Sequence, residues 1–434
     1  MKEIFASGGL LARHLSAFEA RSGQLQMAEA VAATLAAGAK GEVEGQRASV
    51  LLVEAETGIG KTLAYLIPAL LSGQRVVVST ATINLQDQIL NKEIPLIERV
   101  LGQSAAALCV KGRQNYLCLY RWNQYRSSPQ LSLIEDGDIN RIEQWLDKTN
   151  SGDRAELPWL ADGSLLWPKI SAQSSQCLGN DCPDGASCFV NQLRKQAGSA
   201  RLLIVNHHLF FSDLALRQAG FAEILPHYQA VIFDEAHHLE GVATQFFGKT
   251  FSQYQLLDLL ADLERQAEAD LPAKSRDPII AFARGLSPRL ERFTLLFPAQ
   301  RGRYPLADII AGNGSWAQEV EGIGVGLDQL AELLAAQASK GEVWNILSTR
   351  AIELAVNLCH ICLPLAKGEE DRFVHWYERR ERTISLSATP VRVALELEKT
   401  LYSSVQSCVM TSATLSAGGD FSYVKERLGL DATT

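Results

Sequence analysis

The sequence predicts an α/β fold in which a parallel β-sheet with helices on both faces is interrupted by two insertions. Five short, continuously apolar runs indicate strands that are buried on both faces, as the strands of parallel sheets are. The first run is followed by a glycine-containing turn and a helical pattern, which is how a βαβ unit begins. The predicted strands are 49–53, 76–80, 202–206, 230–233 and 408–411.

Two long stretches between these strands differ from the rest of the chain. The stretch between the second and third predicted strands holds a group of cysteines, polar loops and four tryptophans. In the stretch between the fourth and fifth, Leu256, Leu260 and Leu263 recur at the spacing of a helix face. We therefore expect a cysteine-bearing insertion first and a mostly helical insertion second.

Composition and charge narrow the class of protein. The 434 residues are 47% hydrophobic and 21% charged, an ordinary globular balance that excludes a disordered chain. The formal charge, 41 − 49 = −8, excludes a protein that coats nucleic acid through bulk positive charge. Residues 109–126 carry four cations and no anion, which predicts either a local nucleic-acid surface or a solvated basic face.

Cysteine usage and hydropathy indicate a reducing compartment. Eight cysteines in 434 residues rule out a disulfide scaffold. No apolar run reaches the roughly 18 residues that a membrane-spanning helix needs, and the N-terminal segment does not resemble a secretory signal. We expect a cytoplasmic protein without a membrane partner.

Residues 55–62 (AETGIGKT) predict a phosphate-binding loop between the first strand and a helix. Gly58 and Gly60 allow backbone N–H groups to face a phosphate. Lys61 is expected to reach the β- and γ-phosphates of ATP, and the Thr62 hydroxyl to ligate Mg²⁺. A glycine-rich turn without a ligand is the alternative, and Ala55 departs from the first glycine of the general pattern. The predicted nucleotide-binding residues are Thr57, Gly58, Ile59, Gly60, Lys61 and Thr62.

Residues 234–237 (DEAH) follow the fourth predicted strand. A carboxylate at the carboxyl end of a parallel strand lies where a phosphate loop needs its metal ion and attacking water. Asp234 would hold Mg²⁺, and Glu235 would orient or deprotonate the water. His237 is suited to couple this site to a neighbouring segment. A surface acidic turn is the alternative.

The two motifs, in this order, resemble motifs I and II of the superfamily 2 helicases. Residues 412–414 (SAT) follow the last predicted strand and resemble motif III of that family. A second SAT lies at 387–389. We prefer 412–414 because the strand before it is more apolar, and we interpret the upstream copy as a second strand of the same domain.

Arg21, Gln24 and Met27, spaced three apart, precede the phosphate loop and resemble the Q motif of this family. The resemblance implies that Gln24 reads the adenine edge and that Arg21 supports it. One turn of a solvated amphipathic helix is the alternative.

Cys118, Cys177, Cys182 and Cys188 have the spacing C-x58-C-x4-C-x5-C. Structural zinc sites favour two close cysteine pairs. One distant cysteine with three close ones suits the four corners of a cubane cluster better. The spacing alone leaves zinc, an iron–sulfur cluster and buried free thiols open.

Four further segments resemble one branch of that superfamily. Residues 111–118 (KGRQNYLC) and 177–183 (CLGNDCP) resemble the iron–sulfur helicases related to XPD. Residues 206–210 (NHHLF) and 233–237 (FDEAH) resemble the bacterial DinG/YoaA branch of that family. The resemblance implies ATP-driven 5′→3′ unwinding of DNA, action at single-stranded or forked DNA in the repair of stalled replication forks, and a 4Fe-4S cluster on the four cysteines. It also suggests a replication or repair protein as a partner.

The resemblance assigns the two insertions to known domains. It implies a first RecA-like helicase domain in three parts, 1–110, 201–240 and 381–434. A 4Fe-4S domain would occupy 111–200 and a helical Arch domain 241–380.

A DNA path is expected beside the phosphate loop. Residues 80–86 resemble motif Ia, whose hydroxyl and N–H groups bind phosphates without reading bases. Tyr116, in the basic stretch, could stack on a base or pack around the cluster, and its position in the sequence supports both. The predicted DNA-binding residues are Thr80, Thr82, Gln86, Lys111, Arg113 and Tyr116.

A superfamily 2 motor closes two RecA-like domains on one nucleotide. Only nineteen residues, 416–434, follow Leu415, and no Q-x-x-G-R sequence of motif VI occurs. A second domain would need on the order of 150–200 residues. We therefore expect a first motor domain that binds nucleotide and single-stranded DNA but hydrolyses ATP poorly alone. A non-catalytic DNA-binding or assembly module and a zinc-stabilised P-loop ATPase are the competing functions.

Overall fold

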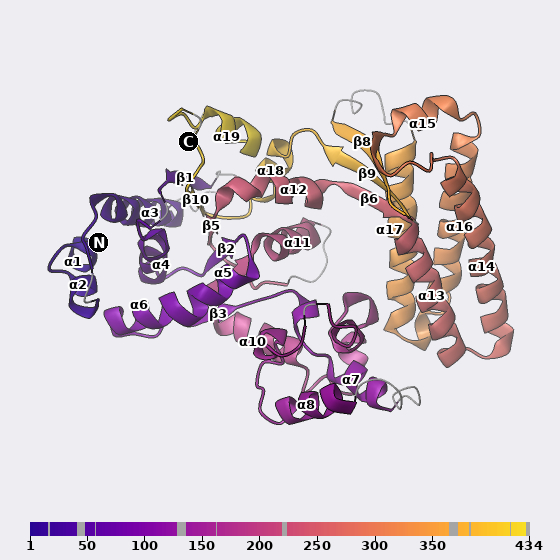
Figure 1. The fold of residues 1–434 in the computed structure, drawn as a ribbon, viewed down its shortest axis with the longest axis horizontal. Coiled ribbons are helices and arrows are strands. Elements are labelled where there is room, and N and C mark those ends of the chain that lie inside the picture. The colour runs from indigo at the N-terminus through magenta and orange to yellow at the C-terminus, as the bar shows by residue number, and fades with distance from the viewer. Residues whose placement is uncertain are drawn as a thin grey trace. The chain divides into compact units, whose positions relative to one another are not determined.

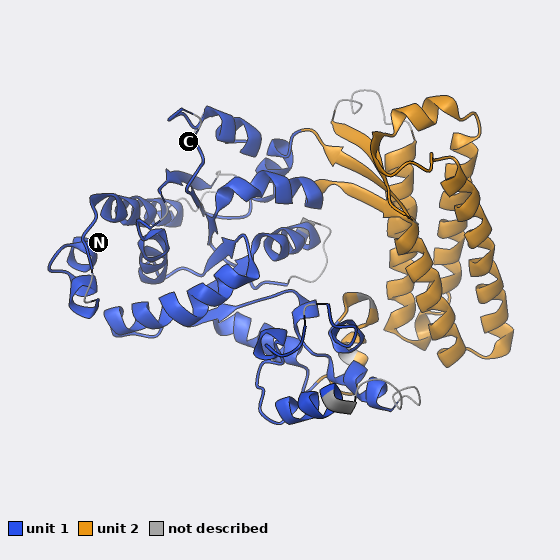
Figure 2. Ribbon diagram, viewed as in Figure 1, with its two compact units in different colours: residues 1–172, 186–246, 392–434 blue, residues 173–185, 247–391 orange. Residues whose placement is uncertain are grey.

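The computed structural model describes residues 1–15, 18–40, 48–56, 58–127, 136–161, 163–218, 224–363, 372–381, 383–416 and 418–430. They form two compact units (Figures 1 and 2). Unit 1 contains residues 1–172, 186–246 and 392–434, and unit 2 contains residues 173–185 and 247–391. Among the described helices, none combines the length and the apolar character needed to cross a bilayer.

Unit 1 is built on a six-stranded parallel sheet, which confirms the predicted α/β fold class. All five predicted strands are present. Four of them are buried along almost their whole length, which explains why they are continuously apolar, and the strand at 49–54 is partly buried. The sixth strand, β3, has only three residues at the sheet edge, too few for a pattern to stand out. In spatial order the strands are β1 (Ser49–Glu54), β10 (Ser407–Ser412), β5 (Ala230–Asp234), β2 (Val76–Thr80), β4 (Leu202–Asn206) and β3 (Ala107–Cys109).

The strand order brings three distant motifs to one edge of the sheet. Strand β10 lies between β1 and β5, and all three run parallel. Glu54 pairs with Ser412, and Thr411 pairs with Asp234, so the three strands end at the same level. The phosphate loop, the DEAH turn and the second SAT segment therefore share the carboxyl edge of the sheet, where parallel α/β folds bind ligands.

Helices and connecting segments cover the sheet of unit 1. Helix α3 packs against α4, β1 and β10, and α11 packs against β4 and β2. Their buried faces, with Val31, Leu35, Leu66 and Ile67, form a core with the strand side chains. The helices around the sheet are α1 (Lys2–Phe5), α2 (Leu10–His14), α3 (Ser22–Lys40), α4 (Lys61–Leu71), α5 (Ile83–Gln88), α6 (Ile94–Leu101), α11 (His207–Gln218), α12 (Leu239–Phe247), α18 (Ala394–Thr400) and α19 (Ser422–Leu428).

The first insertion contributes a separate small core to unit 1. Trp122, Trp167, Ile170 and Leu117 are buried together, which accounts for part of the tryptophan content of this stretch. Isolated bridges join Tyr116 to Asp153 and Leu117 to Ser171. Its helices are α7 (Leu119–Arg126), α8 (Asp136–Leu146), α9 (Trp167–Ile170) and α10 (Phe189–Ser199).

Unit 2 combines long helices with a four-stranded antiparallel sheet of order β6-β9-β8-β7. The leucine periodicity correctly predicted the helices, whose buried faces form one core with Trp316 and Trp344. The sheet itself was not predicted, because three of its strands are short or half-exposed. Its elements are α13 (Gln253–Asp270), α14 (Ala273–Leu295), α15 (Ala307–Gly312), α16 (Trp316–Ala335), α17 (Glu342–Cys362), β6 (Lys249–Ser252), β7 (Gly302–Pro305), β8 (Phe373–Arg379) and β9 (Ile384–Pro390).

The upstream SAT segment, residues 387–389, lies in β9 of this antiparallel sheet. Strand β9 pairs with β6 and β8, not with a strand of the parallel sheet. The interpretation of this copy as a second strand of the motor domain was therefore wrong. The alternate residues of β9 that are buried face the core of unit 2 and explain the apolar character of this segment.

Candidate nucleotide-binding site

The phosphate loop connects the end of β1 to the start of α4. Gly58 and Gly60 have φ values of 85° and 87°, in the left-handed region that glycine tolerates without strain. A Cβ atom at Gly60 would also collide with the Gln24 side chain. The loop therefore needs glycine at both predicted positions. Thr57 lies outside the described residues.

The predicted Q-motif residues contact this loop directly. Gln24, in the first turn of α3, donates from Nε2 to the Gly60 carbonyl at 3.1 Å. Arg21, just before α3, donates from Nη1 to the Gly58 carbonyl. A Cβ at Gly23 would meet the Ile59 side chain, so this turn also packs closely on the loop. Both predicted side chains thus lie against the phosphate loop.

Lys61 begins α4, and its side chain folds back over the loop. Its Nζ atom donates to the Ala55 carbonyl at 2.9 Å. The ammonium group therefore sits within the curve of the loop, at the N-terminus of α4, where an anion is favoured. Among the described residues, the only hydrogen-bond acceptor that a phosphate would have to replace is the neutral Ala55 carbonyl.

The DEAH turn begins at the end of β5. Asp234 is only 7% exposed. Its Oδ2 accepts a hydrogen bond of 3.0 Å from the Tyr65 hydroxyl, and its Oδ1 accepts one of 3.1 Å from the Glu235 N–H. Burial raises the pKa of Asp234, and the hydrogen bond from Tyr65 opposes that rise. The carboxylate is therefore buried and held by a donor on each oxygen.

Glu235 and His237 connect the DEAH turn to β10. The Nδ1 atom of His237 lies 2.7 Å from Ser412 Oγ. Ser412 Oγ also donates to Glu235 Oε2 at 3.5 Å, and His237 Nδ1 is 3.4 Å from the same carboxylate oxygen. Burial is the main reason that the pKa of His237 is lowered, which favours the neutral ring. The SAT segment at 412–414 therefore lies where the preferred interpretation expects it.

Glu54 is a member of this site that the sequence did not reveal. Its Oε2 accepts hydrogen bonds from the backbone N–H groups of Leu415, at 2.6 Å, and Ser416. Its Oε1 accepts one from the Ser416 hydroxyl at 2.8 Å. These bonds lower the pKa of Glu54. The sequence feature that could have indicated this residue is its position, because Glu54 is a charged residue at the end of an apolar strand.

A buried histidine lies behind the DEAH turn and was also missed. His207 Nδ1 is 2.7 Å from Ser79 Oγ, and both residues are fully buried. The His207 ring lies 6.0 Å from the Phe233 ring, between centroids. Burial lowers the pKa of His207 to about 3, so the ring is neutral. The contact links β2 to the start of α11.

Four of the six predicted DNA-binding side chains are buried. Thr80 and Gln86 have no exposed surface, Tyr116 is 3% exposed and Lys111 is 4% exposed. Gln86 donates to the carbonyls of Val110 and Ile204, both at 3.2 Å. Burial corrects the prediction for these four residues, because a strand of DNA cannot reach them. Thr82 is exposed at the N-cap of α5, and Arg113 is partly exposed.

Lys111 has internal partners instead. Its Nζ lies 2.8 Å from Asp87 Oδ1 in α5 and 2.8 Å from Asp153 Oδ2 in the first insertion. The Lys111 N–H donates to the Tyr116 hydroxyl at 3.1 Å. The basic stretch therefore contains a lysine that joins two segments of unit 1. Charge counting alone could not separate this role from a DNA contact.

The four cysteines of the predicted cluster divide between the two units. Cys118 and Cys188 belong to unit 1 and precede α7 and α10, and Cys177 and Cys182 belong to unit 2. All four are partly buried. No three histidine, cysteine or acidic side chains converge as metal ligands within the described residues. The cluster therefore stays a prediction.

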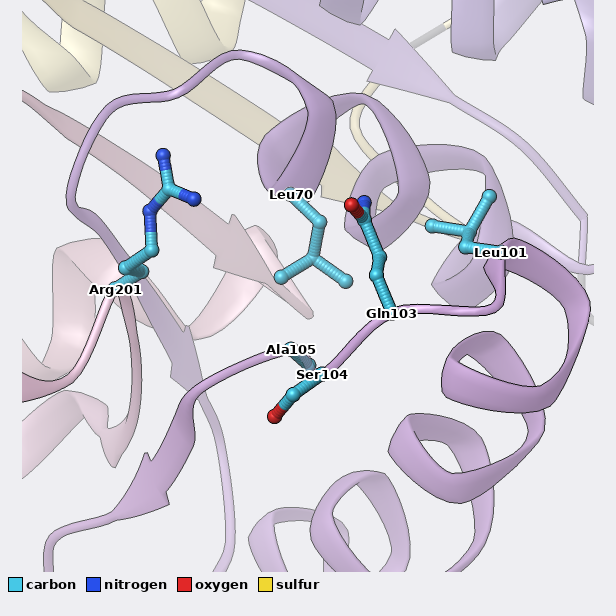
Figure 3. Close-up of a pocket in the computed structure, with 6 residues that line it drawn as sticks. All are labelled: Leu70, Leu101, Gln103, Ser104, Ala105 and Arg201. Carbon is cyan, nitrogen blue, oxygen red and sulfur yellow. The ribbon is translucent and has the colours of Figure 1, made fainter.

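A small hollow lies at the opposite, amino edge of the parallel sheet (Figure 3). Its volume of about 20 Å³ has room for about one water molecule. Arg201, which precedes β4, and Ser104 and Ala105, which precede β3, are part of its lining. It is too small for a nucleotide and lies away from the predicted motifs.

The sequence of this chain is similar to a known protein family and to several known proteins. The family model for the DEAD/DEAH box helicase matches residues 33–133. The chain is similar to the ATP-dependent DNA helicase YoaA of Haemophilus influenzae, with 32% identity over 99% of this chain and 65% of the relative. The YoaA of Escherichia coli is 33% identical over the same shares. The ATP-dependent DNA helicase DinG of Photobacterium profundum is 27% identical over 97% of this chain and 66% of the relative.

The chain thus spans just under two thirds of the length of these relatives. Among solved structures it is similar to a truncated XPD, with 14% identity and a TM-score of 0.47, covering 93% of this chain and 96% of that one. A second similar structure, an XPD helicase, has 16% identity and a TM-score of 0.46, covering 95% of this chain and 61% of that one.

Proposed function

Because this chain belongs to the family of DinG- and YoaA-type helicases related to XPD, we propose that unit 1 contains the first motor domain of an ATP-driven 5′→3′ DNA helicase. The observation that carries the proposal is the meeting of the phosphate loop, the DEAH turn and the SAT segment at one sheet edge. An ordinary glycine-rich turn does not need the contacts of Gln24 and Arg21 with its carbonyls. We propose single-stranded or forked DNA as the substrate, in DNA repair or the rescue of replication forks.

The residues at this edge fit a magnesium nucleotide. Lys61 would bind the β- and γ-phosphates, and Thr62 and Asp234 would hold Mg²⁺, which neutralises phosphate charge. Glu235 would orient the attacking water. The contact between His237 and Ser412 supports a role for His237 in passing a change at the nucleotide to β10. Gln24 and Arg21 would bind the adenine side.

We expect turnover to need a further group beyond the residues described at this sheet edge. In related phosphoryl-transfer enzymes an arginine brought to the nucleotide contributes about 10³–10⁵ in rate. We propose that a second RecA-like domain provides it in the working motor. Residues 1–434 alone should bind nucleotide and single-stranded DNA weakly, with little hydrolysis.

Substitution of Lys61 tests the nucleotide site. Lys61→Ala should weaken binding of Mg·ATP by at least about tenfold, because it removes a charge-assisted contact to the phosphates. Lys249→Ala, an exposed lysine in β6, is the matched control and should bind as the unchanged chain does. The measurement is the dissociation constant of a fluorescent ATP analogue. Equal affinities in all three proteins would contradict the proposed site.

We further propose that a 4Fe-4S cluster is bound by Cys118, Cys177, Cys182 and Cys188. The cluster would stabilise the fold by joining the segments that carry these cysteines. Four thiols are the donor set that such a cluster takes. Cys118 and Cys188 both lie at helix N-termini, where a thiolate is favoured. Protein purified without oxygen should contain about four irons and four acid-labile sulfides per chain. Zinc in their place, or neither element, would refute the cluster.

A further inference from the structure

Tyr65 connects two parts of the proposed magnesium site. It lies one turn after Lys61 in α4, and its side chain is fully buried. Its hydroxyl donates to Asp234 Oδ2 at 3.0 Å, and the Thr62 side chain lies close enough to interact with the same hydroxyl. One phenolic oxygen therefore lies beside both residues that would hold Mg²⁺. These residues come from α4 and β5, 172 positions apart in the sequence (234 − 62).

The Asp234 carboxylate depends on this contact for its orientation. The Tyr65 hydroxyl donates to Oδ2, and the Glu235 N–H donates to Oδ1. A carboxylate that is 7% exposed needs such donors, because burial without them is costly. With one bond on each oxygen, the plane of the carboxylate is fixed. Each oxygen keeps a further lone pair for another ligand.

We propose that Tyr65 is a positioning residue whose hydroxyl sets the spacing and orientation of Thr62 and Asp234 for the magnesium ion of the nucleotide. This inference rests on the proposed function, because it requires a magnesium nucleotide at this sheet edge. Side chains that hold metal ligands in place typically change metal affinity by about 10- to 100-fold when they are removed. Tyr65 is in a position to hold both proposed ligands, Thr62 and Asp234, in this way.

A purely structural role is the competing explanation. The Tyr65 side chain is part of the buried core of unit 1, to which Ala64, Leu66 and Ile67 of the same helix also belong. If the residue served only this core, loss of the hydroxyl would lower stability and leave the metal dependence of nucleotide binding unchanged. The two roles therefore differ in a quantity that can be measured.

The test is Tyr65→Phe, which removes one oxygen and keeps the ring. Tyr402→Phe is the matched control, since Tyr402 is 3% exposed and its hydroxyl donates to the Leu428 carbonyl at 2.8 Å. The probe is a fluorescent ADP analogue, titrated at a series of Mg²⁺ concentrations and in EDTA. We expect Tyr65→Phe to raise the Mg²⁺ concentration for half-maximal enhancement of binding about tenfold. Binding in EDTA should stay the same, and Tyr402→Phe should match the unchanged chain in both conditions.

The inference is overturned if Tyr65→Phe has the magnesium dependence of the unchanged chain, whatever its stability. To separate stability from positioning, the unchanged chain is also titrated in urea at a concentration that gives it the stability of Tyr65→Phe. If urea alone reproduces the shift, the inference also fails. Loss of binding in Lys61→Ala, with no effect of Tyr65→Phe, would reject this inference and retain the proposed function. No effect of either substitution would reject the proposed function.

Discussion

At the scale of single residues, Glu235 holds a backbone conformation that only glycine adopts freely. Its φ and ψ are 56° and 47°, in the left-handed region. Such a conformation in another residue costs on the order of 1–3 kcal/mol and persists where its surroundings enforce it. Here the Asp234 carboxylate accepts a hydrogen bond from the Glu235 N–H, and the Ser412 hydroxyl donates to the Glu235 side chain. The strain therefore lies at the residue proposed to orient the attacking water.

The buried His207 makes the free energy of unfolding depend on pH. Burial, and to a smaller extent the nearby His238, lowers its pKa from 6.5 to about 3. Between these two pH values the unfolded chain binds a proton that the folded chain does not. The contribution of His207 to stability is therefore complete above about pH 6.5 and is lost as the pH falls, by about 1.4 kcal/mol per unit.

His207→Gln should remove this pH dependence while it keeps a polar partner for Ser79. From pH 7 to pH 5, the free energy of unfolding should fall less in the variant than in the unchanged chain, by roughly 2 kcal/mol. Urea denaturation at the two pH values measures the difference. An equal fall in both proteins would show that the imidazole is protonated in the folded state.

At the scale of elements, sequence pattern predicted what depends on burial along one segment. Four of the five main strands are apolar because both of their faces are covered, and β1, at the sheet edge, is partly buried. The long helices of unit 2 repeat leucine on one face. Strands β6, β7 and β8 of the antiparallel sheet were missed because their exposure is mixed, and the segment in β9 was predicted as a strand but assigned to the wrong sheet. Contacts between distant segments left no pattern. Tyr65 and Glu54 could be placed in the site only after the fold was known.

The basic stretch shows the same limit for charged residues. Lys111 and Arg113 are two positions apart, yet one is buried between Asp87 and Asp153 and the other is partly exposed. Residue type indicates a charge, and only the fold decides whether the charge meets a partner or a ligand. Lys111 thus joins α5 to the first insertion, and Arg113 remains a proposed DNA contact.

Substitution of these two residues should give opposite phenotypes. Lys111→Met should lower the free energy of unfolding by about 3 kcal/mol, because it leaves two aspartates without their cation. Arg113→Ala should leave stability within about 0.5 kcal/mol and should weaken binding of single-stranded DNA, with a salt dependence reduced by about one charge. Urea denaturation and DNA titrations at several salt concentrations measure both effects. Equal loss of stability in the two variants would contradict this division of roles.

At the scale of the whole molecule, the parallel sheet gathers residues from distant parts of the chain at one edge. Arg21, Glu54, Lys61, Asp234 and Ser412 all contribute to the carboxyl ends of three adjacent strands or to the loop beside them. The order of the motifs along the sequence predicted this meeting, because parallel strands end at a common edge. This edge offers one face for a nucleotide, and the proposed motor needs a second domain opposite it.

The most direct test of that claim is ATP hydrolysis by residues 1–434, measured with and without single-stranded DNA. Binding of Mg·ATP should be detectable and should depend on Lys61. Hydrolysis should remain near the background rate even with saturating DNA, because the arginine of a second domain is worth about 10³–10⁵ in rate. Robust, DNA-stimulated turnover that Lys61→Ala abolishes would contradict the proposal that residues 1–434 need a second domain for turnover.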